Sequence, residues 1–275
     1  ERQTSAIAFE IMTSGAESEL ESTLQRNLVD LARFFLETGD FIALQDLHQR
    51  WIDYLNRDEI ATFFLAEEVL ETLHSQEFVV ETLDALDRFG SEKQEEVRNY
   101  ILAVGSPFAD ELVSRLAETE NMAVRRYYMA CLKEMGRDAH EAILERLNDE
   151  RWYLVRNLII VLAQHQHPAL VKKLYPLIDY PHPRVRQEIL KLMYLYNRPR
   201  AERQLLEELQ SQHISSQFYA AQIADRSQDK AVQRQLLKIL RDGPLNEEGF
   251  ELKVQILRAL SKIGDAGVVS FLEGL

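Results

Sequence analysis

The feature that most constrains this chain is an acidic residue followed seven residues later by an arginine, a pair that recurs at a nearly fixed interval. The three acid–arginine pairs are Glu118 and Arg125, Asp149 and Arg156, and Asp179 and Arg186. Each arginine follows a valine, and the arginines are spaced 31 and 30 residues apart. A period in this range is typical of repeat proteins, in which each small unit packs against the next. The pattern therefore predicts an array of stacked units.

Apolar residues follow each Val-Arg pair at the spacing of an amphipathic helix. Val155, Leu158, Ile159 and Leu162, for example, fall at i, i+3, i+4 and i+7. Shorter helices are predicted between these, over residues 139–147, 169–178 and 201–209. Each unit is then a pair of helices with two apolar faces. Because one pair cannot bury both faces, neighbouring pairs must stack.

This pattern resembles HEAT repeats, which carry an Asp in the turn between two helices and a Val-Arg at the start of the second helix. The resemblance is strongest over about residues 106–200. It implies an all-α fold, a right-handed α-α superhelix built as a solenoid of about six to seven helical hairpins. In such a stack the arginine of one repeat could reach the turn acid of the next, forming a ladder of charge-assisted hydrogen bonds. The alternative for these charges is a solvated helix start.

The pattern weakens towards both ends of the chain. We expect a frayed segment over residues 1–16 and one continuous solenoid over 17–275, since no linker rich in Pro, Gly or Ser divides it. Within the solenoid, residues 17–90 are predicted to form divergent capping hairpins, 91–200 the best-matching repeats, and 201–275 divergent, C-terminally truncated repeats. Helices are predicted over 17–38 and 41–55, with Gly39 as a stop. A short dimerising coiled coil is the alternative for these two helices.

Composition bears on the compartment and on the kinds of partner. No apolar run approaches 18 residues, so no membrane span is predicted. The single cysteine, Cys131, excludes a disulfide scaffold and fits the cytoplasm. The chain begins without Met and ends on an apolar stretch, so we expect a segment of a larger bacterial protein. The net charge of −13 disfavours general nucleic-acid binding, for which a strongly basic face is expected.

One segment departs from the acidic character of the chain. Residues 151–200 contain 9 basic and 2 acidic residues, whereas residues 1–150 contain 14 basic and 32 acidic ones. The candidate partner-binding residues are the cations and aromatic residues Arg151, Trp152, Tyr153, Lys172, Lys173, Arg184, Lys191, Tyr194, Arg198 and Arg200. They predict a protein partner, either an acidic segment or another domain of the same protein. The alternatives are solvated helix faces for the cations and inter-repeat packing for the aromatic residues.

Residues that could carry chemistry are few. His165, His167 and His182 lie in predicted loops one repeat apart and could meet at a metal, although no carboxylate or thiolate is spaced with them. No glycine-rich phosphate loop or credible Ser/His/Asp grouping is present, and no cofactor is expected. We therefore expect a non-catalytic protein-interaction scaffold that binds along its curved surface. A HEAT-like lyase or hydrolase with a site in the groove, or a HEAT-like nucleic-acid-binding protein, is the alternative.

Overall fold

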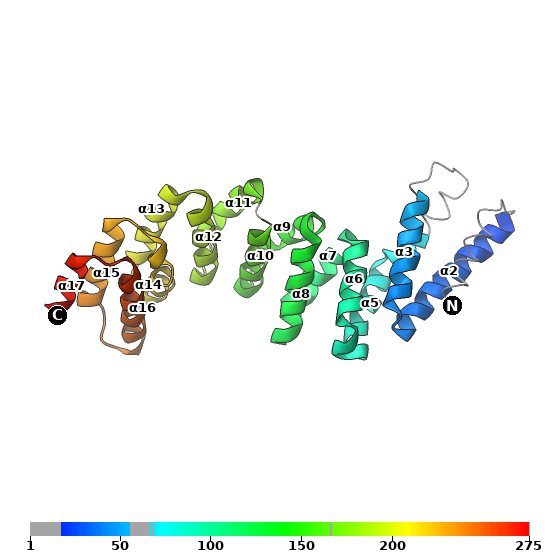
Figure 1. Ribbon diagram of the computed structural model, residues 1–275, viewed down its shortest axis with the longest axis horizontal. Coiled ribbons are helices and arrows are strands. Elements are labelled where there is room, and N and C mark those ends of the chain that lie inside the picture. The colour runs from blue at the N-terminus through cyan, green and yellow to red at the C-terminus, as the bar shows by residue number, and fades with distance from the viewer. Residues whose placement is uncertain (1–17, 56–66, 68, 166, 275) are drawn as a thin grey trace. The chain divides into compact units, whose positions relative to one another are not determined.

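The computed structural model describes residues 18–55, 67, 69–165 and 167–274, and the predicted frayed segment 1–16 lies outside them (Figure 1). The fold is all-α, as predicted, and no β-strand occurs in the described ranges. Within the same ranges, no helix is both long enough and apolar enough to cross a membrane. The chain divides into two compact units, Glu1–Arg146 and Leu147–Leu275. The continuity of one domain across this boundary stays a prediction.

The first unit contains two rows of helices. Its helices include α2 (Ser18–Thr38), α3 (Phe41–Leu55), α5 (Gln76–Phe89), α6 (Gln94–Val104), α7 (Ala109–Glu118), α8 (Met122–Met135) and α9 (His140–Glu145). Helices α3, α6 and α8 pack in sequence order in one row, while α2 packs on α5 and α7 on α9 in the other. The helix α2 ends at Gly39, whose φ of 73° is favoured by glycine, so the predicted stop is confirmed.

The second unit repeats this arrangement. Its helices are α10 (Trp152–Gln164), α11 (Pro168–Leu174), α12 (Pro183–Tyr196), α13 (Arg198–Leu209), α14 (Ile214–Ala221), α15 (Lys230–Asp242), α16 (Glu247–Ile263) and α17 (Ala266–Glu273). Helices α10, α12, α14 and α16 pack in order along one row, and α13 packs against α15 in the other. The apolar side chains predicted to face inward on α10, including Val155, Leu158 and Leu162, are buried between these rows.

Side-chain hydrogen bonds join residues about one period apart within each unit. In the first unit, Arg115 Nη2 donates to Asp84 Oδ1 (2.7 Å), 31 residues away. In the second unit, Arg186 Nη2 donates to Ser216 Oγ (2.7 Å), 30 residues away. Residues one sequence period apart are therefore spatial neighbours, as expected when similar units stack.

The short helices differ from the predicted ones at their ends. Residues 139–147 and 169–178 were expected to be continuous helices, but α9 and α11 stop early and continue as the 3₁₀ turns Arg146–Asn148 and Tyr175–Asp179. In the second case Pro176 stands in the first turn of the 3₁₀ segment, where it cannot supply a backbone N–H to continue the α-helix. The tighter turns bring the chain into the loops that precede α10 and α12, where the candidate site lies.

Candidate partner-binding pocket

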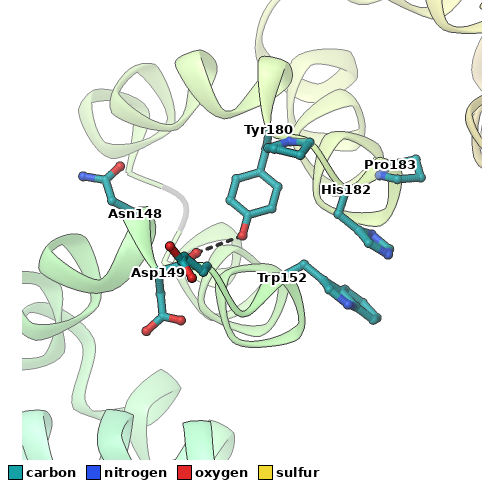
Figure 2. Close-up of a pocket in the computed structure, with 8 residues that line it drawn as sticks. Asn148, Asp149, Trp152, Tyr180, His182 and Pro183 are labelled. Carbon is teal, nitrogen blue, oxygen red and sulfur yellow. Dashed lines mark hydrogen bonds between the residues drawn. The ribbon is translucent and has the colours of Figure 1, made fainter.

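A pocket of about 530 Å³ lies between the turn that precedes α10 and the turn that precedes α12 (Figure 2). We call it the Trp152 pocket. The residues that line it are Asn148, Asp149, Glu150, Trp152, Tyr180, Pro181, His182 and Pro183. Five of these residues have an aromatic ring or are prolines, and the two carboxylates belong to the turn before α10. Such a mixture of flat apolar surface and few polar groups is typical of a binding site.

The turn before α10 is held together by Asp149. Its carboxylate accepts hydrogen bonds from the backbone N–H of Arg151 (2.9 Å), from Arg151 Nε (2.9 Å) and from Arg151 Nη2 (2.7 Å). Across the pocket, the Tyr180 hydroxyl donates to the backbone carbonyl of Asp149 (2.8 Å; Figure 2). Burial raises the pKa of Tyr180, and Asp149 and Glu150 add to the effect, so the hydroxyl keeps its proton. The bond ties two successive turns, 31 residues apart.

The turn before α12 places His182 against Trp152, the first residue of α10. The imidazole of His182 lies parallel to the indole of Trp152, with centroids 3.9 Å apart and an interplanar angle of 6°. His182 is the N-cap of α12, and its Nδ1 accepts the backbone N–H of Arg184 (3.2 Å). Partial burial, then Arg184 and Arg186, lower the pKa of His182, so the ring is neutral at pH 7. The stack is thus a rigid, uncharged platform.

Arg184 connects this platform to the next repeat. Its guanidinium carbon lies 5.3 Å from the ring centroid of Trp152 and 5.3 Å from that of Tyr219. Its Nε also donates to the Tyr219 hydroxyl (2.5 Å). Contacts of a cation with the faces of two rings are favourable, and they fix the orientation of a long side chain that would otherwise be mobile. Arg184 therefore links Trp152 in the wall of the pocket to Tyr219 in the next repeat.

The ten predicted partner-binding residues do not form one uniform strip. Trp152 lines the pocket, and Arg151 and Arg184 support it. Three of the cations are paired with acids, through the ion pairs Arg151–Asp149, Lys191–Glu188 and Arg198–Glu202. The remaining residues are Tyr153 beside Trp152, Tyr194 bonded to Glu202, Arg200 over the Tyr175 ring, and exposed Lys172 and Lys173. Two of these acids, Asp149 and Glu202, lie outside residues 151–200, so a count over that segment does not include them, whereas Glu188 is one of the two acids that it contains.

The contacts described for the three periodic arginines go to groups other than the predicted turn acids. Arg125 Nη2 donates to the backbone carbonyl of Thr119 (2.7 Å), and Arg186 Nη1 donates to that of Tyr180 (2.9 Å), in each case six residues earlier. Side chains on a helix point towards its N-terminus, so an arginine in the first turn folds back onto the carbonyls of its own preceding loop. The predicted acids Glu118 and Asp179 do not receive these bonds.

The other two arginine contacts reach forward to non-periodic acids. Arg156 Nη2 lies 3.1 Å from Glu188 Oε1 on α12, the next helix of its row. Arg186 Nε and Nη2 make a two-point contact with the Glu208 carboxylate on α13 (2.7 and 3.1 Å). Neither Glu188 nor Glu208 belongs to the repeated sequence pattern. Charge-assisted bonds between repeats therefore exist in the second unit, with partners that the pattern did not mark.

The hypothesis of a histidine metal site finds no support in the geometry. Among the described residues, no three His, Cys, Asp or Glu side chains are grouped so that they could hold a metal ion. His167 instead is the N-cap of α11, and His182 stacks on Trp152. The Tyr180-Pro-His-Pro loop was noticed for its histidine, while the structure uses its tyrosine and its aromatic face. Tyr180 and Tyr219 were missed, although each lies about one period from a residue it contacts.

Comparisons with known proteins leave the family open. No model of a known protein family matches the chain, and no curated protein matches it either. The resemblance to HEAT repeats therefore rests on the sequence pattern alone.

Proposed function

We propose that this chain is a HEAT-like helical-repeat scaffold, a right-handed α-α superhelix, that binds a protein partner without catalysing a reaction. The observation that carries the proposal is the Trp152 pocket. An aromatic platform at the surface, held rigid before binding, offers a large contact area at low entropic cost. Stacked rows of helices and bonds between residues one period apart support the repeat architecture.

The polar groups of the pocket are arranged for binding. The Asp149 carboxylate already accepts three hydrogen bonds from Arg151, and His182 Nδ1 already accepts one from the helix backbone. Groups committed in this way position a wall and are poorly placed to exchange protons with a substrate. An apolar or proline side chain of an extended protein segment would pack into this pocket beside Trp152 and Tyr180, as such side chains do in aromatic-lined grooves.

The preferred charge of the partner is inferred from three cationic residues. Arg184 beside the pocket, and exposed Lys172 and Lys173 on α11, favour a segment with acidic residues next to its apolar anchor. Exposed Glu150 in the pocket lining opposes this preference locally. We therefore expect the anchor to supply most of the affinity and the cations to supply a salt-dependent part.

The test is a selection of peptides from a random display library against the intact chain, followed by titration of labelled peptides by fluorescence anisotropy. We expect Trp152→Ala to weaken the selected peptides by about tenfold or more. The control is Leu195→Ala, an exposed apolar residue of α12, which should change affinity by less than about twofold. Peptides that bind the Trp152 variant as well as the unaltered chain would refute the pocket as the binding site.

Charge is tested with the same peptides in a triple variant, Arg184→Glu with Lys172→Glu and Lys173→Glu. Acidic peptides should bind this variant several-fold more weakly, and their affinity for the unaltered chain should fall as salt is raised. If neither change affects binding, the preference for an acidic segment is wrong, while the pocket is still judged by the Trp152 variant.

A further inference from the structure

The helix α16 (Figure 1) carries two apolar stripes, although only one faces the core of its unit. The inner stripe is buried and consists of Leu252, Ile256, Ala259 and Leu260. The outer stripe is exposed and consists of Phe250 (58% exposed), Val254 (46%) and Leu257 (43%). A second apolar stripe on a helix that is already packed marks a surface for another helix.

The outer stripe has the spacing of a helix-pairing seam. Phe250, Val254 and Leu257 fall at i, i+4 and i+7, the alternation of four and three residues that coiled-coil positions follow. The next position in this series is Ser261, a small residue that allows close approach. The seam is therefore centred on Val254 and runs along about three turns of the helix.

Charged residues lie along one flank of this seam, with the acidic residues at one end and the basic residues at the other. Glu247 and Glu251 stand towards the N-terminus of α16, and Arg258 and Lys262 towards its C-terminus, and all four are exposed. Their spacing of four, seven and four residues keeps them on the same flank of the helix. One end of the flank is thus acidic and the other basic, which makes the surface complementary to itself in reverse.

We propose that two copies of this chain associate through α16, packed antiparallel about a two-fold axis near Val254. A two-fold axis places the same surface of each copy against the other. Phe250 of one copy then meets Leu257 of the second copy, and Val254 meets its own equivalent. On the flank, Glu251 of each copy faces Arg258 of the other, so every dimer contains this pair twice. In a parallel pair the two copies of this flank would lie on opposite sides of the seam, so Glu251 and Arg258 of the two copies would not meet.

The expected strength follows from the size of the surface. Lys262 already lies 2.6 Å from Asp225 of its own chain, so its contact with Glu247 of the second copy adds little, and the pair of Glu251 and Arg258 decides orientation. A seam of three turns is at the small end of specific interfaces. We therefore expect a dissociation constant of about 10–100 µM, with association visible only in concentrated solution.

Sedimentation velocity of the intact chain from about 5 to 500 µM gives the first test. The unaltered chain should shift from monomer to dimer over this range. Val254→Asp, at an exposed position, should weaken association by about tenfold or more, because it places two carboxylates at the axis. The control Leu195→Asp, an exposed residue of α12, should associate as the unaltered chain does. A chain that stays monomeric throughout overturns the proposal.

A charge exchange tests the antiparallel orientation. Glu251→Lys and Arg258→Glu each turn both symmetric pairs from attractive to repulsive, so each should weaken the dimer by about tenfold. The double variant restores opposite charges across the axis and should recover affinity to within about threefold. If the double variant is as weak as the single ones, or if the single ones have no effect, the proposed pairing is wrong.

A cysteine at the axis gives direct evidence of contact. Val254→Cys should form a disulfide between two copies under mild oxidation, because a residue at a two-fold axis lies beside its equivalent. Ser270→Cys, exposed on the neighbouring helix α17, is the control and should cross-link much more slowly. The native Cys131 is buried and does not interfere. Equal rates for the two variants would show that collisions, and not the proposed interface, join the chains.

Discussion

A pair of histidines in the first unit, one buried and one half-buried, should make the stability of that unit depend on pH. His48, on α3, and His74, which follows the helical residues 69–73, face each other with their Nε2 atoms 3.0 Å apart. The ring of Tyr100 meets His48 edge-on, with centroids 6.3 Å apart. A hydrogen bond between two Nε2 atoms requires one ring to donate and the other to accept, so at least one ring must be neutral. Burial, and then His74, lower the pKa of His48 to about 4.

The magnitude follows from the difference between the folded and unfolded states. An unfolded histidine has a pKa of about 6.5, so unfolding below that pH takes up a proton that the folded His48 does not bind. The stabilising contribution of neutral His48 to the free energy of unfolding is therefore fully present above pH 6.5 and is lost as the pH falls towards 4. The slope is about 1.4 kcal/mol per pH unit, and the total loss is about 3 kcal/mol. Burial lowers the pKa of His74 as well, which acts in the same direction.

The assay uses the positions of the two tryptophans. Trp51 is buried in the first unit, one turn from His48 on α3, whereas Trp152 lies in the second unit. In a Trp152→Phe background, fluorescence therefore reports on the first unit. Urea unfolding curves at pH 7.5, 6.5, 5.5 and 5.0 should give a free energy of unfolding that falls with pH, through the histidine pair and through carboxylates elsewhere.

The control is His48→Gln in the same background. Its amide does not titrate and can still donate to His74 Nε2, so the carboxylate effects are common to both proteins and cancel in the comparison. Between pH 6 and 5 the unaltered pair should lose about 1 kcal/mol more than the variant for each pH unit. Slopes that agree within about 0.3 kcal/mol per unit would refute the assignment of a buried, neutral His48.

Three further predictions concern stability and reactivity. Arg186→Ala should lower the free energy of unfolding of the second unit, followed by Trp152 fluorescence, by about 1–3 kcal/mol, because it removes the two-point contact to the largely buried Glu208 carboxylate. Arg156→Ala should cost about 1 kcal/mol or less, because the buried Glu188 keeps its ion pair with Lys191, and equal losses would contradict this ranking. Leu158→Ala should cost about 2–5 kcal/mol in the same assay, and a loss below about 1 kcal/mol would mean that the site collapses around the missing side chain. Cys131, whose pKa burial raises to about 12, should react with thiol reagents only after urea unfolding, so rapid labelling of the folded protein would contradict its burial.

The helices were largely predictable because their causes are local. The predicted helices over 17–38 and 41–55 are found as Ser18–Thr38 and Phe41–Leu55, since an unbroken apolar stripe and the glycine between them are sufficient. The ends of the shorter helices were harder to predict. At these ends the backbone hydrogen bonds of a 3₁₀ turn, between residues i and i+3, compete with those of an α-helix, between residues i and i+4. A proline such as Pro176, which has no backbone N–H, favours one of the two.

The pocket was only partly predictable, because it depends on how two turns meet. Trp152 and His182 were both noticed, one as a contact residue and the other as a possible metal ligand. Their stacking requires the turns before α10 and α12 to lie side by side. The hydrogen bond from the Tyr180 hydroxyl to the backbone carbonyl of Asp149 connects these two turns. The sequence pattern shows how many residues separate such turns, but it does not show how close the side chains of two neighbouring turns lie in space.

The periodic arginines show what a repeat pattern encodes and what it leaves to other residues. Arg125 and Arg186 share a contact with the carbonyl six residues earlier, and this contact depends only on helix geometry, so it can recur with the pattern. The contacts from Arg156 to Glu188 and from Arg186 to Glu208 depend on where the neighbouring helix lies, and their acids follow no period. Two of the three turns are thus bonded in the same way, while the contacts of Arg156 and Arg186 to the neighbouring helices each use a different acid. In such a chain the repeated residues should tolerate exchange between repeats, whereas the non-periodic acids hold each repeat to its own neighbour.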